Sequence, residues 1–111
     1  MALDETDDDE DRAAIAALWV SAQGRVLDRV TTIDTAIAAL AAGTPQDGGP
    51  HAAGAGEAHK LAGSLGTFGL PEGSRLAKEL ELLLEGDAPS ADEAARLAAA
   101  LRAAVEAGPT A

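Results

Sequence analysis

A single histidine, His59, lies in a stretch of small, helix-forming residues, "GAGEAHKLAGSLGTFGL" at residues 54–70. Neutral imidazole is available near physiological pH and is a nucleophile that can form covalent intermediates. The chain has no cysteine, which excludes disulfides, thiol catalysis and thiolate-bound metals. His59 is therefore the leading candidate for chemistry, and its orientation decides what kind of chemistry that is.

Helical spacing at about 100° per residue predicts that His59 points to solvent. The opposite face of its helix is expected to pack into the core through Ala58, Leu61, Leu65 and Phe68. Glycine inside a helix costs about 1 kcal/mol relative to alanine, so several glycines beside one exposed histidine favour a functional reason. Small neighbours leave the ring open to another macromolecule. The small neighbours of His59 on this face are Ala55, Gly56, Ala62, Gly63 and Gly66.

The elements that position His59 are all predicted to be helices. Apolar residues recur at helical spacing along the chain, and glycine and proline mark the breaks. A short first helix is expected to bend or end near Gly24, and a loop is expected from Gly43 to Pro50. The first three predicted helices cover residues 11–22, 25–42 and 51–68. A fourth helix is expected to begin at Pro71, and a fifth is expected to begin after a capping pattern formed by Ser90 and Glu93. The pattern predicts an all-α fold, an antiparallel four-helix bundle with a short N-terminal capping helix.

The predicted core is a set of apolar stripes, one on each helix. Gly69 is expected to end the His59 helix in a left-handed conformation. The stripe residues are Ile15, Leu18 and Trp19; Val26, Val30, Ile33, Ile37 and Leu40; Leu76, Leu80, Leu83 and Leu84; and Ala94, Leu97, Leu101 and Val105.

Charge and composition exclude several function classes. The net charge is −11, and residues 4–11, "DETDDDED", carry seven of the nineteen acidic residues. We expect residues 1–11 to be a disordered acidic tail before a helical-bundle domain at residues 12–107. Nucleic-acid binding is not expected, because clustered cations are missing and Trp19 and Phe68 are the only aromatic residues. The chain has neither a membrane-spanning apolar run nor a basic signal sequence, so a cytoplasmic location is expected.

The segment "AHKLAGSLGTFG" resembles the phosphorylation-site helix of histidine phosphotransfer (HPt) domains. That family's pattern has a histidine, a leucine two residues on, Gly-Ser at the fourth and fifth positions, and a glycine at the tenth. The following "LPEGSRLAKELE", at residues 70–81, is similar to the family's next helix, and the resemblance extends over residues 12–107. The matching residues are His59, Leu61, Gly63, Ser64 and Gly69.

The resemblance implies a phosphocarrier in a two-component phosphorelay. His59, through Nε2, would accept a phosphoryl group from a receiver-domain aspartate or a histidine kinase and pass it on. The protein would not be an enzyme by itself, because the partner receiver would supply Mg²⁺ and most of the catalysis. No cofactor is expected in this chain. Its expected partners are a response-regulator receiver domain, a histidine kinase, or both, and the chain is expected to be a free-standing monomer.

One position departs from the family pattern. The family usually has a lysine three residues after the histidine, and here that residue is Ala62. Lys60, Arg75 and Lys78 are the candidate substitutes for its charge. Gly63 and Gly66 would form the docking surface, and Ser64 is expected to be structural.

Ala62 keeps an alternative open, in which the chain is a helical adaptor that binds a receiver or kinase without being phosphorylated. A second alternative is that the chain is a fragment of a hybrid sensor kinase. A metal site is not expected, because His51 and His59 are eight residues apart rather than three or four.

Overall fold

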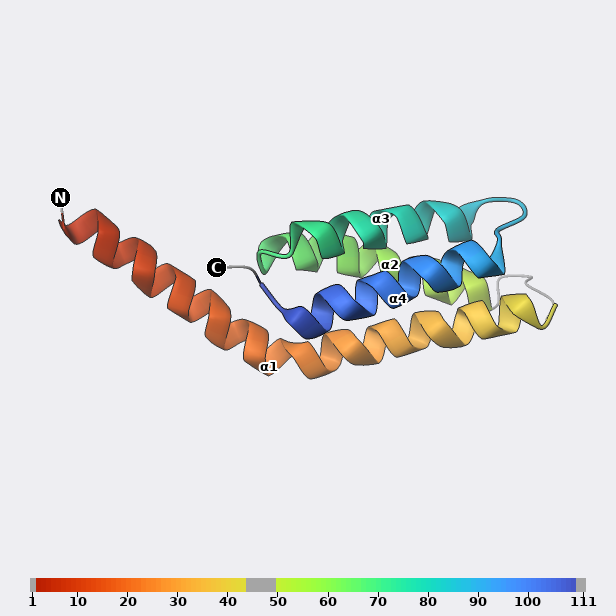
Figure 1. Cartoon of the computed structure of the whole chain (residues 1–111), viewed down its shortest axis with the longest axis horizontal. Coiled ribbons are helices and arrows are strands. Elements are labelled where there is room, and N and C mark those ends of the chain that lie inside the picture. Colours follow the sequence, from red (N-terminus) through yellow and green to blue (C-terminus); the bar gives the residue numbers. More distant parts are fainter. Residues whose placement is uncertain (1, 44–49, 110–111) are drawn as a thin grey trace.

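The computed structural model describes residues 2–43 and 50–109, with side chains for residues 10–43 and 52–109. Four helices make up this part of the chain: α1 (Ala2–Ala41), α2 (Pro50–Thr67), α3 (Pro71–Glu85) and α4 (Ala91–Ala107). They form an elongated all-α bundle of 59 × 21 × 21 Å (Figure 1). The predicted fold class is confirmed. Most of the loop predicted at residues 43–50, and the side chain of His51, lie outside the described residues.

The helices occupy the four corners of the bundle in chain order. Within the described residues, α2 packs against α1 and α3, and α4 also packs against α1 and α3, with no contact across either diagonal. Pro50 and Pro71 open α2 and α3, as predicted. Gly69 has φ of +83°, the left-handed conformation predicted for the end of the His59 helix. The tight turn at Gly69 therefore makes α2 and α3 antiparallel neighbours.

The first helix differs from the prediction. Instead of a short capping helix followed by a separate one, α1 is a single helix of 40 residues. Gly24 is the only glycine in α1, which contains no proline, and the cost of about 1 kcal/mol for one glycine does not stop a helix that has already nucleated. Residues 2–11, expected to be a disordered tail, form the first turns of α1. Figure 1 shows this red part of α1 running past the end of the bundle, and a bend in the orange segment that follows it.

The length of α1 explains why part of its apolar stripe is exposed. Trp19 is buried and packs edge-on against Phe68, with ring centroids 5.3 Å apart. Ile15 and Leu18 are 41% and 61% exposed, although the sequence predicts that they line the apolar face. α2 ends at Thr67 and α4 ends at Ala107, so neither helix extends alongside the earlier turns of α1. The bundle core thus begins at Trp19.

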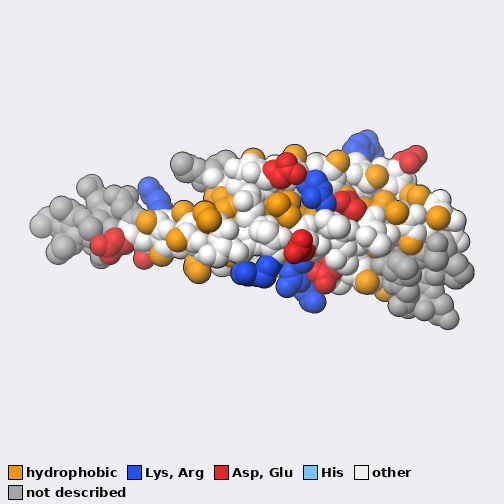
Figure 2. All heavy atoms as spheres, turned by 90° about the horizontal axis from the view of Figure 1, so that it is seen from below, with side chains coloured by type: hydrophobic (Ala, Val, Ile, Leu, Met, Phe, Trp, Pro, Cys, Tyr) orange, Lys and Arg blue, Asp and Glu red, His pale blue; other side chains and the backbone are white. Residues whose placement is uncertain are grey.

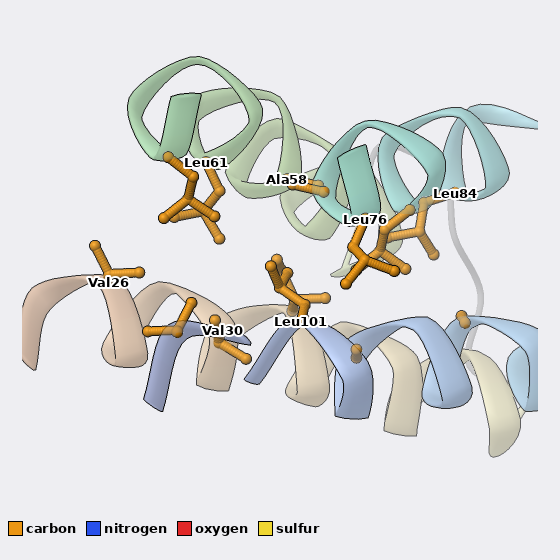
Figure 3. Close-up of a cluster of buried hydrophobic side chains, with 14 of the residues drawn as sticks. Val26, Val30, Ala58, Leu61, Leu76, Leu84 and Leu101 are labelled. Carbon is orange, nitrogen blue, oxygen red and sulfur yellow. The ribbon is translucent and has the colours of Figure 1, made fainter. Parts of the chain in front are cut away.

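The core itself follows the predicted stripes (Figure 3). Leu40, Leu83 and Leu97 are only partly buried and pack at its edge. At the start of α4, the Ser90 hydroxyl accepts a hydrogen bond of 3.2 Å from the Glu93 backbone N–H, as its capping role predicts. The fully buried side chains of greatest volume are Val30, Ile33, Leu61, Leu65, Leu80, Leu84, Leu101 and Val105.

Gly54 marks the closest approach of α2 to its neighbours. A Cβ at this position would lie 2.8 Å from the Ala36 Cβ and 3.3 Å from Leu84 Cδ1. The Ala36 methyl group moves only with its backbone, so Gly54→Ala is expected to destabilise the fold by about 1–3 kcal/mol. Gly56→Ala is the matched control, because its Cβ would meet nothing within 4 Å. It should stabilise the same helix by about 0.5–1 kcal/mol. Urea unfolding measures both variants, and equal stabilities would contradict this packing.

Candidate functional site

His59 lies in the middle of α2 with its side chain 71% exposed. On the opposite side of the helix, Ala58, Leu61 and Leu65 are fully buried and anchor α2 in the bundle. The predicted orientation of His59 is therefore confirmed. The side of the molecule seen in Figure 2 shows no histidine among its coloured side chains, and acidic and basic groups are interspersed there.

Small residues surround the imidazole on α2. A Cβ added to Gly56 or Gly63 would have no neighbour within 4 Å, and one added to Gly66 would reach only the Ser74 Oγ, at 3.7 Å. We call His59 and these three glycines the His59 face. They are all exposed.

The His59 face is narrower than the sequence predicts. Ala55 is buried and Ala62 is partly buried, although both were expected beside the exposed histidine. The reason is that α3 packs along this edge of α2. The Ser74 hydroxyl of α3 donates a hydrogen bond to the carbonyl oxygen of Ala62. The position where the family usually has a lysine is therefore directed toward α3.

A carboxylate from α3 holds the imidazole in place. The Nδ1 of His59 lies 2.9 Å from Oε2 of Glu81, whose side chain is only 8% exposed. Lys78 donates a hydrogen bond of 3.2 Å to the other oxygen, Oε1. An ionised carboxylate can only accept hydrogen bonds, so the proton of a neutral imidazole sits on Nδ1. Nε2 then carries the free lone pair and is the nucleophilic atom of the ring.

The electrostatics of Glu81 support this arrangement. Burial raises the pKa of the Glu81 carboxyl, but hydrogen bonds from Lys78 and His59 and the charges of both groups outweigh burial and hold the pKa below its ordinary value. Glu81 is therefore ionised at neutral pH. Glu81 was not predicted from the sequence. The available signal was its place directly after the buried Leu80 and four residues after the buried Ala77, at the border of the α3 stripe.

The three candidate cations are placed differently. Lys60 Nζ lies 3.7 Å from Glu57, a carboxylate that also binds Arg29 at 2.9 Å. Arg75 forms ion pairs with Glu72 and Glu79 of its own helix. Lys78 is bound to the same carboxylate as His59. Of the three, only Lys78 shares a partner with the imidazole.

The site is a surface rather than a pocket. Three surface pockets in the described part of the chain are lined by residues other than His59. Among the described side chains, no group of three or more acidic or histidine residues is arranged to hold a metal ion. The arrangement provides one oriented nucleophile on an open face, to which a second molecule has to bring the reacting group.

A larger side chain at Gly63 tests whether the open space beside His59 matters for the reaction of the imidazole. Gly63→Leu is expected to slow, by roughly tenfold or more, the transfer of any group that a partner brings to His59, because the larger side chain would block the partner one turn from the imidazole. Its free energy of unfolding should change by less than about 1 kcal/mol, because the position faces open space. Transfer kinetics and urea unfolding measure the two effects. Loss of folding instead would show that Gly63 faces a neighbouring helix.

Comparison with known protein families identifies the family to which the chain belongs. The family model described as Hpt domain matches residues 18–108, from the start of the bundle core to the end of α4. Comparisons with curated proteins and with solved structures give no match. In the described part of the chain, no helix has the length and apolar character needed to cross a membrane.

Proposed function

Because the chain belongs to the Hpt domain family, whose members have phosphotransfer roles in two-component signalling, we propose that it relays phosphoryl groups through His59. The observation that carries the proposal is the exposed imidazole whose Nδ1 is bound to the buried Glu81 carboxylate. This contact leaves Nε2 unprotonated and directed away from the carboxylate. The free ring nitrogen is thereby presented to a partner.

The proposed step is a direct displacement at phosphorus. The Nε2 lone pair attacks the phosphorus of an aspartyl phosphate on a receiver domain, and a P–N bond forms as the bond to the aspartyl oxygen breaks. The electron pair leaves with the aspartate, and the ring gains positive charge. Glu81 stabilises this charge through Nδ1–H, as the carboxylate of a catalytic triad does. In onward transfer an aspartate oxygen of a second receiver attacks the phosphorus, the P–N bond breaks and its electron pair returns to Nε2, while Glu81 keeps the ring oriented through Nδ1–H.

The remaining parts of the proposal follow from the open site. His59, Gly63 and Gly66, flanked by Ala62, would form the docking surface for a receiver domain, a histidine kinase, or both. The receiver would supply Mg²⁺ and acidic residues, and this chain would act as a phosphocarrier, as a cytoplasmic monomer without a cofactor of its own.

A second function is a docking adaptor that binds a receiver or kinase without being phosphorylated. The observation that favours it is Ala62, at the position of the family's usual lysine. The two functions differ in whether phosphate stays on this chain. The presence of an oriented, exposed nucleophile supports the carrier over the adaptor.

The discriminating experiment is transfer from a panel of phosphorylated receiver domains, followed by gel separation under non-acidic conditions. We expect at least one receiver to lose its phosphoryl group as this chain becomes labelled. Binding of a receiver without labelling of this chain would overturn the carrier and support the adaptor. A receiver that neither binds this chain nor labels it would count against both functions for that receiver.

A further inference from the structure

We propose that Lys78 is the cation that neutralises the phosphoryl group on His59, in place of the lysine that the family usually has at the position of Ala62. This inference rests on the proposed function and names a residue that touches the transferred group. α3 would thus supply the charge that α2 lacks.

Lys78 lies on the side of α2 to which Ala62, the position of the missing lysine, is directed. Ser74 of α3 bonds to the backbone of Ala62, and α2 and α3 are antiparallel. Each helix advances 1.5 Å per residue and the two helices run in opposite directions. Lys78, four residues after Ser74, is therefore level with Ala58, four residues before Ala62. Lys78 therefore stands beside the turn of α2 that carries His59. A side chain in a helix leans toward the N-terminus, which directs the Lys78 stem from this level toward Ala62.

The other two candidates are less well placed. Arg75 is held by Glu72 and Glu79 on its own helix, and neither carboxylate contacts His59. Lys60 lies on the other flank of α2, where Glu57 connects it to Arg29 of α1. Moving either cation to the phosphoryl group would break ion pairs that do not include the site.

The carboxylate that Lys78 shares with His59 allows the Lys78 ammonium to change its partner when the ring is phosphorylated. In the unphosphorylated protein, Glu81 Oε1 binds Lys78 and Oε2 binds His59. A phosphoryl group on Nε2 adds up to two negative charges and three acceptor oxygens to the ring that shares Glu81 with Lys78. The Lys78 side chain is 55% exposed and has a flexible four-carbon stem, so its ammonium can move from Oε1 to the phosphoryl oxygens. Glu81 keeps its bond to Nδ1–H, and the exchange makes and breaks only ion pairs.

The test uses phosphoramidate, a small-molecule phosphoryl donor, so that receiver docking does not enter the result. The rate of labelling of His59 is measured by mass spectrometry under non-acidic conditions. Lys78→Gln is expected to lower this rate about tenfold, the effect of losing one charge-assisted hydrogen bond. Arg75→Gln, the matched control on the same helix, should change it less than twofold. Lys78→Arg should keep most of the rate.

Combined variants separate direct from indirect action of Lys78. If Lys78 contacts the phosphoryl group, Lys78→Gln lowers the rate by a similar factor in the Glu81→Gln background. If Lys78 acts only by holding Glu81, its effect vanishes in that background and the inference is wrong. Adding Ala62→Lys to Lys78→Gln should restore labelling, because it returns the cation to the family's usual position.

The inference and the proposed function fail in different ways. An unchanged labelling rate in Lys78→Gln, with His59 labelled normally in the parent protein, would overturn the role of Lys78 alone. No labelling of His59 in the parent protein, by phosphoramidate or by any phosphorylated receiver, would overturn the proposed function and this inference with it.

Discussion

The variant His59→Gln is expected to accept no phosphoryl group from any donor while its helix content stays at the parent level. A carboxamide has no nucleophilic nitrogen, so the P–N bond cannot form. The side chain is 71% exposed and lies opposite the buried face of α2, so its replacement leaves the core packing unchanged. Mass spectrometry under non-acidic conditions measures labelling, and circular dichroism measures helix content.

The chain contains one other histidine, which provides the matched control. His51→Gln should be labelled as fast as the parent protein. Persistent labelling of His59→Gln, or loss of labelling in His51→Gln, would show that the phosphoacceptor has been placed at the wrong residue. Loss of helix content in His59→Gln would contradict its position outside the core.

The second large effect is expected at Glu81, a residue that orients the imidazole without touching the phosphoryl group. Glu81→Ala should slow transfer to and from His59 by roughly ten- to a hundredfold, the range typical of groups that position a reactive ligand. Glu81→Gln should be affected less, because its carbonyl oxygen still accepts the Nδ1 hydrogen bond, although the negative charge is lost. Rapid-mixing kinetics with a phosphorylated receiver measure both directions, and receiver binding should be unchanged in both variants.

The pH dependence of folding gives an independent test of the same contact. The pKa of Glu81 is lower in the folded protein than its ordinary value, because Lys78 and His59 outweigh the effect of burial. A depressed folded-state pKa adds stability above the unfolded-state pKa, and this stability is lost as the pH falls through the folded-state value. The parent protein should therefore be more stable than Glu81→Gln at pH 7, and the difference should shrink as the pH falls below about 4.3, the ordinary glutamate pKa, and through the lower folded-state pKa. A difference that does not change with pH would show that Glu81 is not ionised in this contact.

Local sequence signals predicted the parts of the fold that depend on one element at a time. Glycine and proline located the ends of α2 and α3, and helical spacing placed His59 on the exposed side of α2. The exposure of Ile15 and Leu18 was not predictable in this way. It depends on the relative lengths of α1, α2 and α4, which a periodic pattern within α1 does not contain.

The site was predictable only in part for a similar physical reason. His59 and its glycine neighbours belong to one helix, so their shared face follows from spacing. Glu81 and Lys78 reach the imidazole from α3, and their role depends on how α3 packs beside α2. The burial of Ala55 and Ala62 also depends on how α3 packs beside α2. The helical spacing of one helix does not show which of its edges a neighbouring helix covers.

The most direct test of the account is to find which atom carries the phosphoryl group. ³¹P and ¹⁵N NMR of the phosphorylated protein, labelled on histidine nitrogens, resolves the two ring positions. The account predicts phosphorus bound to Nε2 of His59, with a proton on Nδ1 shared with Glu81. Phosphorus on Nδ1, on another residue, or nowhere on a chain that binds its receiver would contradict it.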